Sequence, residues 1–481
     1  MISFLSKYKY WFFIAFIFLL LRLPSLFEPY WYGDEGIYLT LGQGIRKGLI
    51  LYKQIHDNKP PTLYYLAALS QTVFGFRLLL LFVMVPTIYF FYRLSLHFLK
   101  PFLAKISTFI FVILSSIPLI EGNIANAEIF MLFPTILGFY VFLNAKKNIH
   151  YLFSGILLGI AFTIKIPVFI EVSFLIIWIF IQDFSHFFKN FWKLFFKAFL
   201  LGIGFLLPTL IFLFYFYQLH AFLPFLNSAL LQNFSYLSSW ATGIQTSSVG
   251  SGGLVIRFII LIMSWLVIFL LRQKKIISSS VAFLIFWLAA TIFGVLLSTR
   301  PYPHYLIQLL PPGCILLISL FIKKDFKAIL IIIISFLSLG FIISKYNFYF
   351  YPNVAYYQNF YSFKSIFDFN QYFGSRVNTN SQISEFINKN TDSSDSIFVW
   401  GDEPYVYALS NRLPSGRYTV AYHIVDFNGY QETIDSFKTK LPKFIIYYPM
   451  DQRSFPELDS VLSRYYFLDK IYDSVLIFQK R

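Results

Sequence analysis

The feature that most constrains the fold is a series of long apolar runs. Each is about 17 to 23 residues long, and a helix of that length, rising about 1.5 Å per residue, crosses the roughly 30 Å hydrocarbon core of a bilayer. Only 13% of the 481 residues are charged and 57% are hydrophobic, whereas soluble domains carry about 25% charged residues. The sequence therefore predicts a polytopic α-helical membrane protein.

We expect about eleven transmembrane helices, at 11–27, 77–98, 102–120, 127–144, 151–164, 166–182, 194–217, 254–271, 278–297, 303–321 and 327–344. Lys and Arg cluster in alternate connections, as the positive-inside rule requires. With Lys7 and Lys9 in the cytoplasm, the chain ends outside. The net charge of +16 thus reflects topology in the plasma (cytoplasmic) membrane, and we predict no nucleic-acid partner.

The composition divides the chain into two predicted domains. Residues 1–344 form the transmembrane domain, and its first external loop, 28–76, holds short helical patterns at 36–47 and 61–74 that suit the membrane interface. Residues 345–481 are more polar and alternate helical and strand-like patterns, which predicts an external soluble α/β domain. Its strands are expected at 396–400, 444–448 and 474–479, and its helices at 381–388, 403–411 and 455–463.

The first candidate site is the segment YWYGDEG, which places Asp34 and Glu35 just after the first apolar run. Adjacent carboxylates at the membrane surface can remove a proton from a hydroxyl or bind a cation. An exposed turn with solvated acids is the alternative explanation.

The same external loop continues with HDNKPP, which brings Asp57 and Lys59 in front of two prolines. The ammonium of Lys59 suits a lipid-linked phosphate, because it pairs with phosphate as a point charge. A lysine reaching ordinary headgroups would explain it as well.

Further polar residues lie near the predicted outer ends of later spans. Arg300, His304, Tyr305 and Gln308 stand in STRPYPHYLIQLLPP, and Lys165 stands alone in FTIKIP. Polar groups that enter an apolar helix are costly unless they are partnered, so they are site candidates. Glu121, Asn126 and Glu128 bracket another outer turn. An aromatic belt and snorkelling side chains are the competing explanations.

Four motifs occur together and in order: RLPSLFEPYWYGDEGIY, HDNKPPTLYYLAAL, GIAFTIKIP and RPYPHYLIQLLPP. With them, the chain resembles the bacterial family 39-like glycosyltransferases of the GT-C superfamily, which include dolichyl-phosphate-mannose protein mannosyltransferases and aminoarabinose transferases acting on lipid A. The external segment IFVWGDEPYVYALSNRLPSGRY is also similar to the C-terminal domain of many bacterial members.

The resemblance implies transfer of a sugar from a polyprenyl-phosphate donor to a hydroxyl of a lipid, glycan or protein acceptor on the outer face. It implies that Asp34 is the catalytic base and that Glu35 is its orienting or cation-binding partner. Lys59, with Asp57 beside it, would act on the donor phosphate. Arg300 and His304 would face the donor or the leaving phosphate. From their places in the sequence, we also assign Lys165 and Tyr305 to binding of the donor. A divalent metal is left open, and we predict no other cofactor.

Two other functions compete with a transferase. A secondary transporter would show paired repeats with broken helices and a site at mid-membrane, but the polar clusters here lie in outer loops. A non-catalytic scaffold that binds lipid or glycan would keep the same binding residues without needing a base. The effect of replacing Asp34 separates these functions.

Overall fold

The computed structural model describes residues 2–233, 252–297, 300, 302–321, 340, 353–362 and 365–481. Their contacts divide the chain into two compact units. Unit 1 comprises Met1–Leu23, Leu80–Phe212 and Gln232–Asn353, and unit 2 comprises Pro24–Leu79, Leu213–Leu231 and Val354–Arg481. The predicted span 327–344, apart from residue 340, lies outside the described residues, and the predicted domain boundary at 344/345 stays a prediction.

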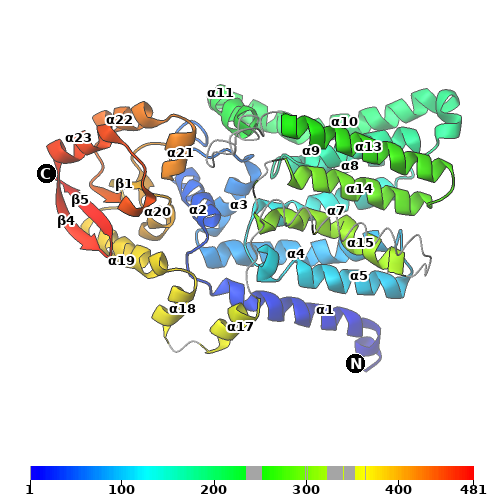
Figure 1. Cartoon of the computed structure of the whole chain (residues 1–481), viewed down its shortest axis with the longest axis horizontal. Helices are drawn as coiled ribbons and strands as arrows, with labels where there is room; N and C mark the ends of the chain where they lie inside the picture. Colours follow the sequence, from blue (N-terminus) through cyan, green and yellow to red (C-terminus); the bar gives the residue numbers. More distant parts are fainter. Residues whose placement is uncertain are drawn as a thin grey trace. The chain divides into compact units, whose positions relative to one another are not determined.

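Unit 1 is built from apolar helices, several of which run side by side (Figure 1). They are α1 (Ile2–Leu26), α4 (Val73–Ser95), α5 (Pro101–Leu114), α6 (Ala127–Phe130), α7 (Leu132–Leu143), α8 (Ile149–Phe162), α9 (Val168–Ile181), α10 (Phe187–Gln218), α13 (Gly252–Gln273), α14 (Ser279–Val295) and α15 (Leu310–Phe321), with 3-10 turns η1 (Pro118–Ile120), η2 (Phe184–His186) and η5 (Pro303–Leu309). Ten of the predicted spans fall on these elements, and α1, α4 and α10 continue by sequence into unit 2.

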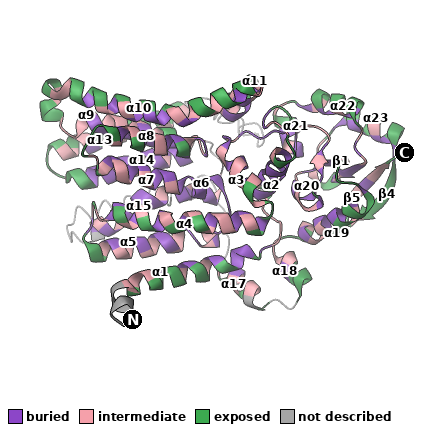
Figure 2. Ribbon diagram, turned by 180° about the vertical axis from the view of Figure 1, so that it is seen from behind, coloured by how far each residue is buried: buried purple, intermediate pink, exposed green. Residues whose placement is uncertain are grey.

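By length and composition, five segments among the described residues can cross a membrane: Tyr8–Leu26, Val73–Ser95, Phe184–Gln218, Gly253–Gln273 and Pro303–Leu320. Six shorter apolar helices accompany them. The total number of spans stays a prediction. Many residues of α10 are exposed (Figure 2), and the exposed residues of α10 and α13 include large apolar ones, for example Trp192, Phe214, Ile260 and Met263. Such apolar surface needs lipid rather than water around it, so the chain is a multi-pass membrane protein.

Small residues allow close packing between α8 and α10. A Cβ atom added at Gly155 would lie 2.2 Å from the carbonyl oxygen of Leu201, and one added at Gly204 would lie 2.2 Å from that of Leu152. Glycine at both positions therefore lets the two backbones approach each other, as in other membrane helix pairs. Elsewhere in the unit, the rings of Phe139 and Trp287 stack with centroids 3.9 Å apart.

Unit 2 contains two short helices from the first predicted external loop, α2 (Gly33–Arg46) and α3 (Thr62–Ser70). They confirm the helical patterns predicted for this loop. The residues of α2 from Glu35 to Gly44 are buried, and α2 packs against α3 and α20 (Tyr405–Ser410). Their placement at the membrane interface stays a prediction. The other helical segments outside the sheet region are α11 (Phe222–Phe225), η3 (Leu226–Leu231), α17 (Asn353–Ser362) and α18 (Ile366–Tyr372).

A five-stranded mixed sheet in the order β2-β1-β3-β5-β4 forms the centre of the C-terminal region. Strand β1 pairs in parallel with β2 and β3, whereas β5 runs antiparallel to β3 and β4. The strands are β1 (Ser396–Trp400), β2 (Leu413–Pro414), β3 (Phe444–Tyr447), β4 (Tyr466–Tyr472) and β5 (Val475–Lys480). The remaining elements are α19 (Ser375–Asn390), α21 (Ala421–Asp426), α22 (Tyr430–Thr439), η6 (Pro449–Asp451) and α23 (Pro456–Tyr465).

Helices cover both faces of this sheet because successive side chains of a strand point to opposite faces. Ile397 and Val399 pack with α19 and α20, and Phe398 and Trp400 pack with α21, α22 and α23. The three predicted strands and three predicted helices are confirmed, with bounds shifted by a few residues. The predicted fold class is therefore confirmed: a polytopic helical membrane protein with an α/β region at its C-terminus.

Candidate functional site

Asp34 and Glu35 lie in the first turn of α2, where the positive end of the helix dipole favours carboxylates. Neighbours on a helix are about 100° apart around its axis, and the two side chains accordingly have different partners. A carboxylate oxygen of Asp34 lies 3.6 Å from the ammonium of Lys59, and Tyr38 donates a hydrogen bond to Asp34 over 3.1 Å. The side chain of Asp34 keeps 25% of its surface exposed.

Lys59 lies between two carboxylates of unit 2. Its ammonium is 3.7 Å from Asp57 as well as 3.6 Å from Asp34, and it stands 5.0 Å from the centroid of the Tyr38 ring. Only 18% of its side chain is exposed. The structure thus brings together Asp34, Asp57 and Lys59, three residues that the sequence had placed in two separate motifs.

Asp57 is fully buried and held from several sides. It accepts hydrogen bonds from the Tyr64 hydroxyl and the Asn58 amide, both over 2.7 Å, and lies 3.5 Å from Nε2 of His423. Burial raises the pKa of its carboxyl, but Lys59, His423, Tyr64 and Asn58 together bring that pKa below its ordinary value. Asp57 is therefore a stable buried anion beside Lys59.

His423 comes from α21, so the C-terminal region contributes to the surroundings of this loop. The neighbouring His56 is buried, its ring lies 5.7 Å from that of His423, and its amide donates to the carbonyl of Arg417 over 2.8 Å. Burial lowers the pKa of His56 well below its ordinary value, and His423 and Arg417 add to this, while Asp57 opposes it. His56 is consequently a neutral imidazole at neutral pH.

Glu35 belongs to a different, fully buried ion network. Arg77 donates two hydrogen bonds of 2.8 and 2.7 Å to its carboxylate and also lies 2.7 Å from a carboxylate oxygen of Glu28. The carbonyl of Ser25 accepts a further bond from Arg77, and Tyr356 donates to Glu28 over 2.5 Å. One guanidinium balances two carboxylates here, a geometry that only arginine provides.

A second polar cluster lies within unit 1. Lys165 is 2.6 Å from Glu128 and 4.8 Å from the ring centroid of Tyr305. His304 pairs with Glu121 through Nδ1 and lies 3.8 Å from Glu128 through Nε2. The cluster thus joins five candidates from three separate segments of the sequence: Glu121, Glu128, Lys165, His304 and Tyr305.

Buried hydrogen bonds support this cluster from two sides. Arg22 donates to the carbonyls of Ser115 and Gly122 over 2.8 and 2.6 Å, at either side of the turn that carries Glu121. Glu171 accepts from Trp287 over 2.6 Å and from Gln308 over 2.7 Å. Arg300, the remaining candidate of this part of the sequence, is half-buried.

Sequence reasoning missed the residues that hold the candidates in place. Arg77 marked only the beginning of a predicted span, although a charge inside an apolar helix is a signal that a partner exists. Glu28 and Tyr64 lie within two of the four sequence motifs, but nothing in the sequence indicates their partners. His423 lies 366 residues from Asp57 in sequence, and no local pattern links them.

In the described part of the chain, no group of three or more His, Cys, Asp or Glu side chains comes together as metal ligands. The two adjacent acids do not form a chelating pair, because Lys59 engages Asp34 and Arg77 engages Glu35.

Solved structures similar to this one include ArnT and an oligosaccharyltransferase. ArnT from Cupriavidus metallidurans bound to undecaprenyl phosphate matches with a TM-score of 0.60 and 12% identity, over 98% of both chains. Its apo state gives a TM-score of 0.58 and 14% identity over the same shares. The apo oligosaccharyltransferase from Archaeoglobus fulgidus matches with a TM-score of 0.50 and 12% identity, over 92% of this chain and 70% of the other.

No protein-family model and no curated protein matches the sequence. The similarity to these solved structures comes from the comparison of structures. At 12 to 14% identity the structural matches establish the fold. The match extends over nearly the whole of ArnT, C-terminal region included, and it confirms the fold that the four motifs predicted. The chain therefore has the GT-C glycosyltransferase fold.

Proposed function

We propose that the protein is a membrane glycosyltransferase that moves a sugar from a polyprenyl-phosphate donor to an acceptor hydroxyl on the extracytoplasmic face. The observation that carries this proposal is the pair of Asp34 and Lys59, a partly exposed carboxylate and an ammonium 3.6 Å apart at the start of α2. Transfer from a phosphate carrier needs these two groups: a base for the attacking hydroxyl and a cation for the leaving phosphate.

In this proposal the acceptor oxygen forms a bond to the anomeric carbon of the donor sugar. The bond from that carbon to the phosphate oxygen breaks, its electrons leave with the phosphate, and the acceptor proton passes to Asp34. Lys59 stabilises the negative charge that develops on the departing phosphate. ArnT was solved with undecaprenyl phosphate bound, which supports a polyprenyl phosphate as the carrier.

Asp57 and Glu35 take supporting parts. Asp57 is a buried anion, which does not attract a phosphate, so we assign it to positioning Lys59. Glu35 binds Arg77 through two hydrogen bonds and thereby fixes the first turn of α2, which orients Asp34. We infer both roles from these contacts within the protein. Neither residue is proposed to touch the substrate.

For the cluster in unit 1 we propose the role that its sequence suggested, contact with donor or leaving phosphate. Lys165 keeps 17% of its side chain exposed while it pairs with Glu128, so its ammonium can still reach an anion. His304, Tyr305 and Arg300 are assigned to the same task.

We also propose that the N-terminus lies in the cytoplasm and the C-terminal region outside, on the basis of the distribution of Lys and Arg.

The test is sugar transfer by the purified protein in lipid, from a panel of polyprenyl-phosphate sugars to a crude envelope extract. We expect transfer by the intact chain and its loss in Asp34→Asn. The matched control is Asp469→Asn, because Asp469 is an exposed aspartate of β4. Equal transfer by Asp34→Asn and the intact chain would contradict the assignment of Asp34 as the base. Movement of a solute across the membrane without formation of a glycosidic bond would instead identify a transporter.

A further inference from the structure

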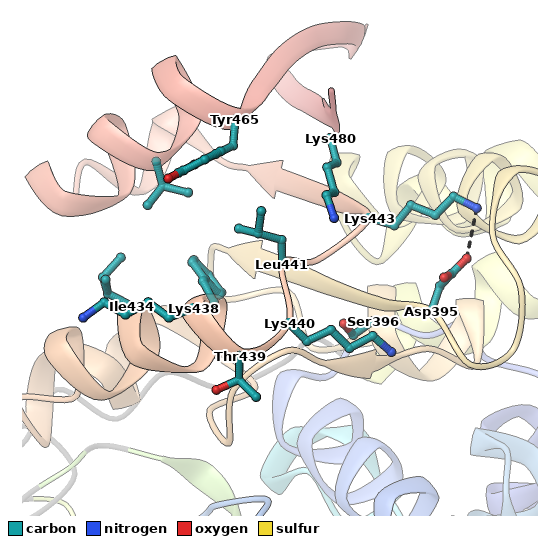
Figure 3. A pocket seen from close by; sticks show the side chains of 12 residues that line it. Asp395, Ser396, Ile434, Lys438, Thr439, Lys440, Leu441, Lys443, Tyr465 and Lys480 are labelled. Atoms are coloured by element: carbon teal, nitrogen blue, oxygen red, sulfur yellow. Dashed lines mark hydrogen bonds and ion pairs between the residues drawn. The ribbon is translucent and has the colours of Figure 1, made fainter.

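The C-terminal region carries a hollow of about 760 Å³ on its surface, within the range of roughly 300 to 1,000 Å³ that small-molecule sites occupy. It lies where the last turns of α22 and α23 meet the beginning of β1 and the end of β5 (Figure 3). Phe437, Leu441 and Val461 are part of its apolar lining. None of the residues proposed above for catalysis lines it.

Four lysines surround this hollow: Lys438, Lys440, Lys443 and Lys480. Two of them lie opposite each other: Lys443, just before β3, and Lys480, at the end of β5. Phe444 pairs with Gln479 in the sheet. At the next position, the amide of Lys480 donates a 3.1 Å hydrogen bond to the carbonyl of Lys443. Like charges directly opposite each other in a sheet are destabilising. Asp395 pairs with Lys443, and an anion bound beside Lys480 would reduce the repulsion further.

Three of the four lysines already have partners. Lys438 lies 2.7 Å from Asp435, Lys440 donates to the carbonyl of Ser394 over 2.9 Å, and Lys443 lies 3.0 Å from Asp395. The ammonium of Lys480 has no hydrogen bond or ion pair within the described ranges 2–233, 252–297, 302–321, 353–362 and 365–481. Figure 3 shows its side chain directed into the hollow between Leu441 and Lys443.

A basic residue near a helix C-terminus can be explained by the helix dipole alone. That explanation covers Lys438, which lies in the last turn of α22. It does not cover Lys480, which ends a strand, or Lys443, which precedes one. The ion pair with Asp395 explains Lys443, so Lys480 is the lysine for which an anionic ligand provides the explanation.

The other lining residues indicate which class of anion fits the hollow. Tyr465, which is 39% exposed, and Thr439 also line the hollow. An aromatic ring offers a flat apolar surface with a polar tip, which suits the carbon-bound hydrogen face of a sugar, and lysines suit a phosphate or carboxylate as point charges. The combination matches an anionic sugar better than an inorganic ion.

We propose that this hollow is a binding site for an anionic sugar, a phosphorylated or carboxylated unit whose charge is bound by Lys480 with support from Lys443. If the protein is the transferase proposed above, this sugar belongs to the acceptor, and only that last step rests on the proposed function. The C-terminal region is then a module that selects acidic glycans.

The test is isothermal titration calorimetry on the full chain in a neutral detergent, without any donor. Glucose 1-phosphate and glucuronate are the anionic probes, and glucose and inorganic phosphate are the controls. We expect at least one anionic sugar to bind more than about tenfold more tightly than either control, since a hydrogen bond to a charged group is worth about this factor. The two anionic probes distinguish a phosphate from a carboxylate ligand.

Two variants assign the binding to the hollow. Lys480→Glu should weaken the anionic probe by more than about tenfold, and Lys480→Arg should retain binding within a fewfold. Lys389→Glu is the matched control, because Lys389 is an exposed lysine of α19 outside the hollow, and it should change affinity by less than about twofold. Thermal melting of each variant verifies folding.

The proposal is overturned by any of three results: no binding of the anionic sugars at millimolar concentration, equal binding of inorganic phosphate, or equal loss of affinity in Lys480→Glu and Lys389→Glu. None of these results depends on transferase activity. Binding by a chain whose Asp34 has been replaced would support the site even where no sugar is transferred.

Discussion

The ammonium of Lys59 lies 3.6 Å from a carboxylate oxygen of Asp34, and the fully buried Asp57 lies 3.7 Å away from the same ammonium. Asp34 is partly exposed, whereas Asp57 is not. The cation is therefore anchored from within the protein and still faces a carboxylate that is partly exposed. This asymmetry separates a positioning acid from a proposed catalytic acid.

Replacement of Lys59 by Met should affect both substrate binding and stability. Loss of a charge-assisted contact to the donor phosphate should raise the KM for the donor by about 10- to 100-fold. The free energy of unfolding should also fall, by up to about 3 kcal/mol, because Asp57 loses a charged partner while it stays buried. Transfer kinetics and melting in detergent measure the two effects.

The double variant Lys59→Met with Asp57→Asn separates these effects. Removal of the buried charge should restore most of the stability but none of the donor affinity. Lys53→Met is the control, since Lys53 is an exposed lysine of the same loop. Full recovery of donor affinity in the double variant would contradict a direct role for Lys59.

Arg77 should be essential for folding rather than for chemistry. Arg77→Met leaves Glu28 and Glu35 as buried carboxylates without their cation, and breaking such a pair costs about 3 to 5 kcal/mol. We expect little folded protein in size-exclusion chromatography of the detergent extract. The triple variant that also carries Glu28→Gln and Glu35→Gln should recover part of the folded fraction.

Arg46→Met provides the comparison for Arg77, because Arg46 is exposed and donates to the carbonyl of Ala68 over 3.0 Å. It should leave the yield of folded protein unchanged. A stable, monodisperse Arg77→Met protein would show that the network with Glu28 and Glu35 does not hold the start of α2.

His56 predicts a pH dependence of stability on the acid side. Its pKa in the folded protein lies well below the ordinary value of 6.5, so between these two values the unfolded chain binds the proton and the folded chain does not. Stability should therefore fall as pH drops below about 6.5, by at most about 1.4 kcal/mol per pH unit from this group. Above pH 6.5 the group contributes no slope.

Melting of the intact chain and of His56→Gln at pH 7.5, 6.5 and 5.5 measures this contribution. The variant cannot take up the proton, so its melting temperature should fall less between pH 6.5 and 5.5. His220→Gln is the control, because His220 is exposed, and it should keep the slope of the intact chain. Identical slopes in all three proteins would show that His56 is not buried as a neutral ring.

The sequence predicted those parts of the fold that depend on local pattern. Strand β1 was located at 396–400, where apolar residues facing both sides of the sheet form one continuous run. Strand β4 was missed, because most of its residues are exposed and do not alternate. Helices α21 and α22 were missed as well, since polar residues and glycines surround them.

The candidate site divides in the same way. Asp34 and Lys59 stood out because polar residues cluster next to glycine, proline and apolar runs. Their supports could not be predicted, because the contacts from Arg77 to Glu35 and from Asp57 to His423 join residues far apart in sequence. Such contacts depend on the packing of α2, α4 and α21, which no local spacing specifies.

The measurement that tests the central claim most directly is the single-turnover rate of sugar transfer by Asp34→Asn, with donor affinity measured on the same preparation. A lost general base predicts a rate lower by about 100- to 10,000-fold, with the Kd of the donor within a fewfold of the intact chain. An unchanged transfer rate would contradict the assignment of Asp34 as the base. A loss of donor binding equal to the loss of rate would move Asp34 from catalysis to binding.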